Sequence, residues 1–561
     1  MEILSAEQIR AWDEYTMQHE PIASIDLMER AAGSCLSWLE KAGHLGRSFS
    51  IYCGKGNNGG DGLALARMLS SLDCAVSVHI LEFGHIGTED FQANLALLHD
   101  TPVEVRFVQT EEHFHPIPAG NILIDALLGS GLNRKLEGVT AGLVEHLNRS
   151  GNEIIAIDIP SGLFVSRSSK GNTVVRATHT LSFQVYKPAF LMPENEAWVG
   201  EVHILDIGLH PGFLQKTNSD SELLDPVIIR AIYKPRNSFA HKGNFGHALL
   251  VTGSYGKIGA AVLSGRSCLK TGAGLVTILV PRCGYNIIQT TLPEAMVLTD
   301  EDEKIHTVLP PAEGSGTASG AASGGDGGSG GASGSTDAAL DKYSVVGVGP
   351  GLGQDPRTVA FLWELLRRYR KPMVVDADAL NILGANPDRM GLLPPYSILT
   401  PHPKEFERLF GPSTDDFARL DKAREMARRH QCIIVLKGHY TFIAMPGGKS
   451  YFNSTGNAGM AKGGSGDVLT GILTALLGQT YSPGEAALLG VYLHGLAGDL
   501  AAAADAQESM LPTDLTGQLG NAFQIIQKSQ YSFCQVAEAP YFCVPRLTGV
   551  ACQASGSSAA R

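Results

Sequence analysis

The sequence predicts an α/β protein made of two domains, each built around a largely parallel sheet. Three observations support this fold class. The chain has 561 residues, more than one ordinary domain holds. Apolar, strand-like runs alternate with helix-like runs in two successive series, and a mixed, polar stretch at 211–240 lies between the series. Hydrophobic residues make up 44% of the chain and charged residues 18%, which is typical of globular proteins with a sizeable core.

The first series occupies the N-terminal third of the chain. Its apolar runs are 49–54, 74–81, 121–129 and 152–160. The first run precedes a glycine turn and the helix-like sequence LALARMLSSL. Near-continuous apolar strands between helices indicate a parallel sheet that is covered on both faces. We therefore expect a Rossmann-like, doubly wound domain over residues 1–215, in which ligands bind beyond the carboxyl ends of the strands.

The second series predicts a second α/β domain over residues 226–525. Its apolar runs are 247–253, 274–281, 343–351, 371–380, 396–403 and 432–439. Residues 313–336 are almost entirely Gly, Ser and Ala, and they cannot bury enough apolar surface to offset their ordering entropy. We expect them to form a flexible insertion inside this domain, and residues 530–561 to form a disordered tail.

Charge and cysteine usage exclude several classes of function. The formal net charge is −12, which argues against nonspecific nucleic-acid binding. Nine cysteines show no CxxC spacing, so we expect no zinc site and a reducing, cytoplasmic location. The N-terminus is polar and charged, and we find no uninterrupted apolar run of ~20 residues, so we expect neither a signal peptide nor a membrane partner.

The first candidate site is the glycine loop GKGNNGGDGLALAR at 54–67, which follows a strand and opens a helix. Glycines allow a ligand to approach the backbone closely, and a helix N-terminus favours a phosphate. A tight packing turn would be glycine-rich as well. The consecutive Asn57 and Asn58 and the nearby Asp61 favour ligand binding, because a packing turn does not need them.

Polar residues follow two further strands of this domain. Asp125 ends one apolar run, and Asp158 and Ser161 end another. In a doubly wound sheet these strand ends can meet in one crevice, where Asn58, Asp125 and Ser161 could hold a hard monovalent or divalent cation. Taken singly, each aspartate could equally be a helix N-cap or a turn residue.

GNNGGDGL, DALLGSGL and IDIPSGL, in this order, resemble the nicotinamide nucleotide hydrate epimerase family, and the opening at 5–32 is similar to it as well. The resemblance covers about 1–210. It implies a potassium ion at Asn58, Asp125 and Ser161, and an acid/base role for Asp158 beside the reacting nicotinamide. Lys187 fits the family, although the residues before it depart from the usual pattern. The resemblance also implies that the hydrated cofactor contacts Asn57, Asn58, Gly59, Gly60, Asp61, Gly129, Ser130, Gly131, Leu132, Asn133, Arg134 and Lys135.

The second candidate site is NAGMAKGGSGDVLTGILTALL at 457–477, in which three glycines lead into a helix that we expect to be amphipathic. Successive N–H groups at a helix start can stabilise the negative charge of a phosphoryl group in transfer. Asp467 would lie in the first helical turn, placed to take a proton from an attacking hydroxyl. The alternative is an aspartate that only complements the helix dipole.

GGSGDVLTG resembles the ribokinase-like fold, and further motifs narrow the resemblance to the nucleotide-dependent hydrate dehydratase family. They include HKGNFGHALLVTGS, VVDADALN and LTPHPKEFERL, and the match covers about 226–520 apart from the Gly/Ser insertion. It implies that Ala260, Gly351, His402 and Asp467 contact the hydrated cofactor. A role of His402 in the structure alone is the alternative. Asp376 and Asp378 either orient Mg²⁺ or waters, or cap the following helix. The adenine nucleotide would contact Lys437, Gly438, His439, Tyr440, Thr441, Gly464 and Gly466.

Together, the two resemblances imply a bifunctional enzyme that repairs hydrated NADH and NADPH. One half would interconvert the R and S epimers at C6. The other would dehydrate the S form by phosphorylating its C6 hydroxyl with ADP and Mg²⁺ and eliminating phosphate. Fused chains of this kind usually use ADP, and their relatives suggest a homo-oligomer. Two alternatives remain: a ribokinase-like small-molecule kinase, and an N-terminal half that is a binding module without catalysis.

Overall fold

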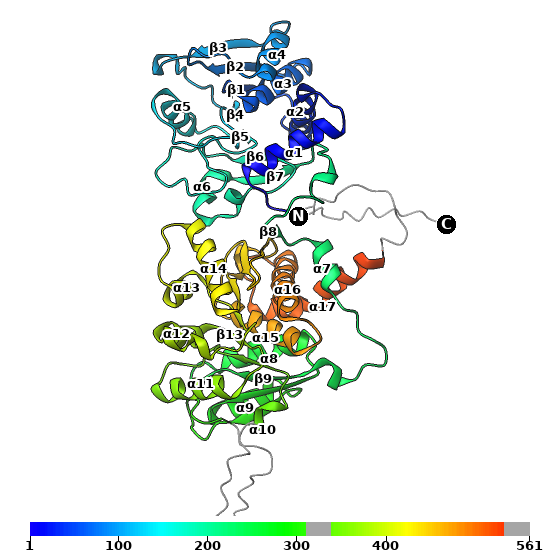
Figure 1. Ribbon diagram of the computed structural model, residues 1–561, viewed down its shortest axis with the longest axis vertical. Helices are drawn as coiled ribbons and strands as arrows, with labels where there is room; N and C mark the ends of the chain where they lie inside the picture. The colour runs from blue at the N-terminus through cyan, green and yellow to red at the C-terminus, as the bar shows by residue number, and fades with distance from the viewer. Residues whose placement is uncertain (310–337, 532–561) are drawn as a thin grey trace, which may run out of the picture. The chain divides into compact units, whose positions relative to one another are not determined.

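The computed structural model describes residues 1–309 and 338–531 of the chain (Figure 1). The Gly/Ser insertion expected at 313–336 and almost all of the tail expected at 530–561 lie outside the described residues. The chain divides into two compact units. One comprises Met1–Leu224 together with Pro401–Asn453, and the other comprises Asp225–Thr400 together with the described residues from Ser454 onward.

The first unit contains a parallel sheet with the strand order β3-β2-β1-β4-β5-β6-β7. Its strands are β1 (Phe49–Cys53), β2 (Val76–Leu81), β3 (Glu104–Val108), β4 (Ile122–Ala126), β5 (Ile154–Ile157), β6 (His179–Phe183) and β7 (Glu201–Leu205). The chain moves outward in one direction from β1 and then in the other direction from β4, and β1 and β4 pair in parallel. This is the doubly wound topology that the sequence predicted, with its switch point between β1 and β4.

Helices cover both faces of this sheet. The helices of the N-terminal segment are α1 (Ala6–His19), α2 (Ser24–Lys41), α3 (Asn57–Ser71), α4 (Glu89–Leu98), α5 (Gly138–Arg149) and α6 (Glu196–Val199). Ile51 of β1 packs in a core with α2 and α3, whereas its neighbour Tyr52 packs in a second core with α5. Successive strand residues thus face opposite cores, as the apolar, non-alternating runs predicted.

Residues 401–453 add a smaller α/β segment to the first unit. It comprises α13 (Pro403–Phe410), α14 (Asp416–His430), β15 (Ile433–Leu436), β16 (Thr441–Ala444) and β17 (Ser450–Asn453). The central strand β16 is antiparallel to both β15 and β17, and β8 (Ser221–Leu223) lies parallel to β17. Glu194 and Asp416 exchange hydrogen bonds, each carboxylate accepting from the other residue's backbone N–H at 2.8 and 3.0 Å.

The second unit contains a parallel run of strands in the order β11-β10-β9-β12-β13-β14. They are β9 (His247–Val251), β10 (Leu275–Val280), β11 (Met296–Thr299), β12 (Val345–Val348), β13 (Val374–Val375) and β14 (Ile398–Leu399). Its helices are α7 (Pro226–Ile232), α8 (Ile258–Lys270), α9 (Tyr285–Thr291), α10 (Ala338–Asp341), α11 (Pro356–Arg368), α12 (Ala377–Ala385), α15 (Ser465–Gly478), α16 (Pro483–Ala504) and α17 (Pro512–Tyr531). The α/β fold class predicted for both halves is confirmed.

The helix that follows the second glycine motif is not amphipathic, so this expectation was wrong. Ten of the fourteen residues of α15 are buried, on all sides of the helix. The reason is close packing against α8: a Cβ on Gly471 would come within 2.2 Å of the carbonyl oxygen of Ser264. The two backbones can approach this closely only because glycine and serines line the contact. The middle of α15 therefore packs directly against the backbone of α8.

The long helix α16 meets the length and composition criteria for a membrane span, which the sequence analysis did not anticipate. It begins at a capping box, in which the Ser482 hydroxyl accepts from the Glu485 N–H and the Glu485 carboxylate accepts from the Ser482 N–H. In its most apolar window, 67% of the residues are buried inside the protein. A buried core helix meets the same two criteria.

Candidate functional site

The glycine loop connects β1 to α3 through a tight turn. It lies at the carboxyl end of β1, next to the switch point of the sheet. A Cβ on Gly59 would come within 1.8 Å of the carbonyl oxygen of Gly54, so this approach requires glycine. The helix begins at Asn57, and its N-cap Gly56 has no side chain to satisfy the first N–H groups. These N–H groups are therefore available to an anionic ligand at the carboxyl end of β1.

Asn58 and Asp158, which come from different strand ends, meet at Gly129. A Cβ on Gly129 would lie 2.9 Å from Oδ2 of Asp158 and 3.3 Å from the side chain of Asn58. Asn58 is 9% exposed, and neither its amide oxygen nor its amide nitrogen has a hydrogen-bond partner among the described residues. A buried amide without partners costs about 1–3 kcal/mol per group, so its retention points to a ligand that supplies them.

Asp125 and Ser161 form a buried pair at the ends of β4 and β5. The Ser161 hydroxyl donates to Oδ1 of Asp125 at 2.6 Å, and its backbone N–H donates to Oδ2 at 2.7 Å. Both side chains are fully buried. Burial raises the pKa of Asp125 to about 6, although the hydrogen bonds from Ser161 and Leu127 oppose the rise. A positive ion here would therefore favour the ionised form.

Asp158 is held in a strained conformation by two partners. Its φ is 68°, which is unusual for a residue other than glycine. Oδ2 accepts from the backbone N–H of Ser130 at 2.8 Å, and Oδ1 lies 2.8 Å from Nζ of the fully buried Lys187. Burial opposes ionisation, but the charge and hydrogen bonds of Lys187 and Ser130 outweigh it and lower the pKa of Asp158. Asp158 is thus an ionised base aimed at the loop that begins at Gly129.

Two further carboxyl groups influence this site, and one of them was missed by the sequence analysis. Burial and the negative charge of Asp158 raise the pKa of Asp13 to about 7, and the same two causes raise the pKa of Asp61 well above its usual range. Asp13 lies on α1, 145 positions before Asp158, and no motif marked it. An acid with a pKa near neutrality next to an ionised base is the arrangement that proton transfer needs.

The loop 129–135 forms the open side of this site. Leu132 donates its N–H to the carbonyl oxygen of Gly129 at 3.2 Å, which closes a turn. Arg134 and Lys135 are exposed, and a Cβ on Gly131 would lie 3.5 Å from the Arg10 guanidinium. Three basic side chains thus surround the loop, as an anionic substrate requires. Their contact with a cofactor stays a prediction.

The second glycine motif begins α15 in the second unit. Gly464 has φ +102°, and a Cβ there would come within 2.6 Å of Leu263, so both the backbone and the space require glycine. Its N-cap residue, Gly464, has no side chain to cap the N-terminus of α15. Asp467 is the third residue of this helix, as the sequence predicted. The Ser465 N–H donates to the carbonyl oxygen of Lys462 at 3.3 Å, so the N–H of Gly466 is the helix-start donor that stands beside this carboxylate.

Gly351 and Ala260 lie together in the second unit. Gly351 follows β12 with φ +63°, and a Cβ on it would stand 3.1 Å from Cβ of Ala260 on α8. The hydroxyl of Ser254 donates to the carbonyl oxygen of Gly351 at 2.8 Å and fixes the loop. The two predicted cofactor contacts thus come from adjacent strand ends, β9 and β12. Their contact with substrate stays a prediction.

Asp376 and Asp378 have partners other than the helix that follows them. The Thr470 hydroxyl of α15 donates to Oδ2 of Asp376 at 2.8 Å, and Asp376 makes no side-chain cap to α12. Oδ2 of Asp378 accepts from the Gly353 N–H at 2.8 Å and lies 3.3 Å from Nζ of Lys257. The sequence left two roles open for these aspartates: orienting Mg²⁺ or waters, and capping α12. The described structure does not show the capping role.

The remaining predicted residues belong to the first unit. His402 is the N-cap of α13: its Nδ1 accepts from the N–H groups of Lys404 and Glu405 at 3.1 and 3.3 Å. His402 therefore has the structural role of capping α13. Its Nε2 lies 3.5 Å from the Glu405 carboxylate. Residues 437–441 form the turn between β15 and β16, where the Thr441 hydroxyl donates to the carbonyl oxygen of Gly438 at 3.1 Å.

The chain resembles known proteins in both halves. Residues 24–189 match the family described as YjeF-related protein N-terminus, and residues 248–521 match NAD(P)H-hydrate dehydratase. A bifunctional NAD(P)H-hydrate repair enzyme from Moorella thermoacetica is 34% identical over 526 residues, 92% of this chain and 95% of the relative. One from Thermofilum pendens is 32% identical, over 94% and 97%. A solved ribokinase-like superfamily protein from Enterococcus faecalis is 28% identical, covers 55% of this chain and 98% of its own, and has a TM-score of 0.46.

Proposed function

Because this chain belongs to the family of bifunctional NAD(P)H-hydrate repair enzymes, we propose that it repairs hydrated NADH and NADPH with two separate sites. The functional division follows residues 1–215 for the epimerase and 226–525 for the dehydratase. The two family matches, over 24–189 and 248–521, support this division. The observation that carries the proposal is the ionised Asp158, paired with buried Lys187 and facing the unpartnered amide of Asn58 at Gly129.

In the epimerase site, Asp158 moves the proton that inversion at C6 requires. Lys187 keeps this carboxylate ionised, and the Ser130 N–H holds its second oxygen in place. The first N–H groups of α3 bind a phosphate of the cofactor, and the loop from Gly129 to Lys135 encloses the hydrated nicotinamide. A positioned carboxylate of this kind contributes a rate factor of about 10²–10⁴.

We propose a potassium ion at Asn58, Asp125 and Ser161. The donor set fits a hard cation, because it consists of amide, carboxylate and hydroxyl oxygens. The amide oxygen of Asn58 is buried without a hydrogen-bond partner among the described residues, and the carboxylate of Asp125 is fully buried, so a positive charge would stabilise both. When bound, the ion supplies positive charge beside the anionic substrate.

In the dehydratase site, Asp467 takes the proton from the C6 hydroxyl of the S epimer. The hydroxyl oxygen then attacks the terminal phosphorus of ADP, and AMP leaves. The C6–O bond breaks as the ring nitrogen donates its electron pair, C5 loses a proton, and inorganic phosphate and NAD(P)H result. The N–H groups at the start of α15 stabilise the charge of the transferred phosphoryl group. The cofactor contacts of Ala260, Gly351 and His402 and the nucleotide contacts of residues 437–441 stay predictions from the family resemblance.

We propose that Mg²⁺ enters as the ADP complex and is held mainly by phosphate oxygens, as Mg²⁺ usually is. Asp378 and Asp376 are the nearby carboxylates, but each already accepts hydrogen bonds from the protein.

The free cysteines of the described residues, Cys35, Cys53, Cys74, Cys268, Cys283 and Cys432, support a reducing cytoplasm. A homo-oligomer remains our expectation.

The two activities are complementary, since hydration of the nicotinamide ring produces both epimers and the dehydratase accepts one. The experiment that tests the proposal starts from the purified R epimer with ADP and Mg²⁺. Formation of NADH is expected, because the R epimer must first become the S epimer on the same chain. If the R epimer persists while the S epimer is dehydrated, the epimerase assignment is wrong. If phosphate passes stably to another alcohol, the chain is a small-molecule kinase.

A further inference from the structure

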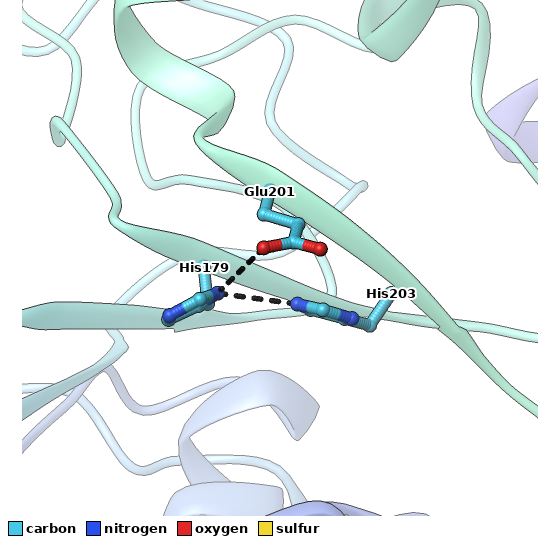
Figure 2. A group of neighbouring side chains, drawn as sticks. All are labelled: His179, Glu201 and His203. Atoms are coloured by element: carbon cyan, nitrogen blue, oxygen red, sulfur yellow. Dashed lines mark hydrogen bonds and ion pairs between the residues drawn. The ribbon is translucent and has the colours of Figure 1, made fainter. Parts of the chain in front are cut away.

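A second cluster of metal-ligand side chains lies on the sheet of the first unit, on β6 and β7. The two strands are parallel, with His179 opposite Glu201 and Leu181 opposite His203. Side chains two positions apart on a strand point to the same face, so Glu201 and His203 project together. Figure 2 shows both of them reaching toward His179 of the neighbouring strand.

The spacing of these side chains suits a tetrahedral metal ion. Nδ1 of His179 lies 3.1 Å from Nε2 of His203 and 4.0 Å from Oε2 of Glu201. All three ligand atoms lie within 4.8 Å of one another. A tetrahedral zinc ion with bonds of about 2.0–2.1 Å separates its ligands by about 3.3 Å. The two ring nitrogens share a hydrogen bond at a separation close to ligand spacing, and a metal ion would take the place of its proton. The Glu201 side chain is 47% exposed and has room to turn toward them.

A carboxylate lies behind His179, at ion-pair distance but beyond hydrogen-bond distance, and it is shared with His44. Oε1 of Glu153 lies 3.9 Å from Nε2 of His179, and Glu153 is itself fixed by Nη1 of Arg47 at 2.6 Å. Histidines that bind metals usually donate their second N–H to a carboxylate, which sets the tautomer and makes the ligand nitrogen more basic. If the Glu153 charge keeps the proton on Nε2, the lone pair of Nδ1 faces His203.

We propose that His179, His203 and Glu201 bind one divalent transition metal ion of the zinc class, with water completing the coordination. Two imidazoles and one carboxylate favour such ions over Ca²⁺ or Mg²⁺, which prefer oxygen. His179 is the first residue of β6, whereas Lys187 follows the other end of the strand. The metal therefore joins the amino ends of β6 and β7 and stabilises the sheet without touching the epimerase residues.

Trp38 of α2 packs beside the cluster, so its fluorescence can report metal binding there. The centroid of its ring lies 4.7 Å from that of His203 and 5.1 Å from that of His179. A paramagnetic ion such as Cu²⁺ at this site should quench the fluorescence of Trp38. The chain has three other tryptophans, so Trp38→Phe shows how much of the quenching arises here.

The test is a titration of the full chain, without an affinity tag and freed of metals by a chelator, with Co²⁺ in excess Mg²⁺. The excess Mg²⁺ occupies oxygen-rich sites. We expect one equivalent of Co²⁺ to bind with the strong visible absorption of four-coordinate cobalt, and Zn²⁺ to displace it. His203→Gln should weaken binding at least tenfold. Glu153→Gln, which keeps all three ligands and removes the nearby negative charge, should weaken it by less than His203→Gln does.

His19→Gln is the matched control, because His19 and His210 form another histidine pair of the first unit, with ring centroids 5.8 Å apart. It should leave Co²⁺ binding unchanged. Circular dichroism and thermal melts verify that each variant is folded, so the outcome does not depend on the proposed epimerase function. Absence of a one-to-one cobalt complex, or equal affinity in wild type, His203→Gln and Glu153→Gln, would overturn the proposal.

Discussion

Nζ of Lys187 lies 2.8 Å from Oδ1 of Asp158, and the lysine side chain is fully buried where it makes this contact. The pair places a positive and a negative charge side by side beneath the loop at Gly129. Since the positive charge is what keeps Asp158 ionised inside the protein, the two residues form one functional element. Its properties lead to the first two predictions.

Lys187→Met should destabilise the first unit by about 3–5 kcal/mol, because it leaves the Asp158 charge buried without a partner. Urea unfolding of the variant measures this loss. The double variant Asp158→Asn with Lys187→Met carries neither charge and should recover part of the stability, although it remains inactive as an epimerase. Equal destabilisation in the single and double variants would show that the pair is not coupled.

Asp158→Asn should lower the rate of epimer exchange by about 10²–10⁴-fold, because the amide cannot take up a proton. Its dehydration of the pure S epimer should match that of the wild type. Chromatographic separation of the two epimers over time measures the exchange. An Asp158→Asn variant that equilibrates R and S at the normal rate would remove Asp158 from the reaction.

Asn58→Leu should stabilise the first unit in potassium-free buffer by about 1–3 kcal/mol, since it replaces an unpartnered buried amide with an apolar group of similar size. Added K⁺ should stabilise the wild type more than this variant, because the variant lacks one of the proposed ligands. Thermal melts in K⁺ and in choline salts make the comparison. Equal responses of the two proteins to K⁺ would place the ion elsewhere.

Stability should fall as the pH rises through the range set by Asp13. Its pKa is about 7 in the folded protein and 3.8 ordinarily. Between these values the folded chain keeps a proton that the unfolded chain releases, so stability is greatest below about pH 4 and declines up to about pH 7. The decline is at most ~4 kcal/mol. Asp13→Asn should lack this component, which the difference between wild-type and variant unfolding curves across pH would show. A parallel pH dependence in both proteins would contradict it.

Asp467→Asn should abolish most dehydration, by about 10²–10⁴-fold, and leave epimer exchange intact. Gly464→Ala is a useful companion, because φ +102° and the contact with Leu263 forbid a side chain there. It should impair both the stability of the second unit and dehydration, whereas Asp467→Asn should alter only catalysis. If Asp467→Asn dehydrates normally, the aspartate serves only the helix dipole.

The apolar runs predicted the parallel strands, because a strand buried on both faces must be apolar along its length. They did not predict β8, since SEL is short and polar and becomes a strand only through its register with β17. Local pattern also suggested an amphipathic α15, which the close contact with α8 overrides.

The residues of the candidate site that lie in glycine motifs could be predicted from the sequence. Those that reach the site only because distant segments meet could not. Gly129, Asn58 and Asp158 were identified from their motifs, but the burial that perturbs Asp13 depends on the tertiary fold. The absence of CxxC suggested no zinc site, yet the cluster around His179 uses no cysteine. Twenty-two positions separate His179 from Glu201, and only the pairing of β6 with β7 brings them together.

The central claim is that one chain carries both repair activities. The most direct measurement is the recovery of NADH absorbance from a mixture of hydrated epimers, with the enzyme, Mg²⁺ and either ADP or ATP. We expect full recovery, with ADP preferred. Recovery that stops when the S epimer is consumed would contradict the epimerase half, and no recovery with either nucleotide would contradict the dehydratase half.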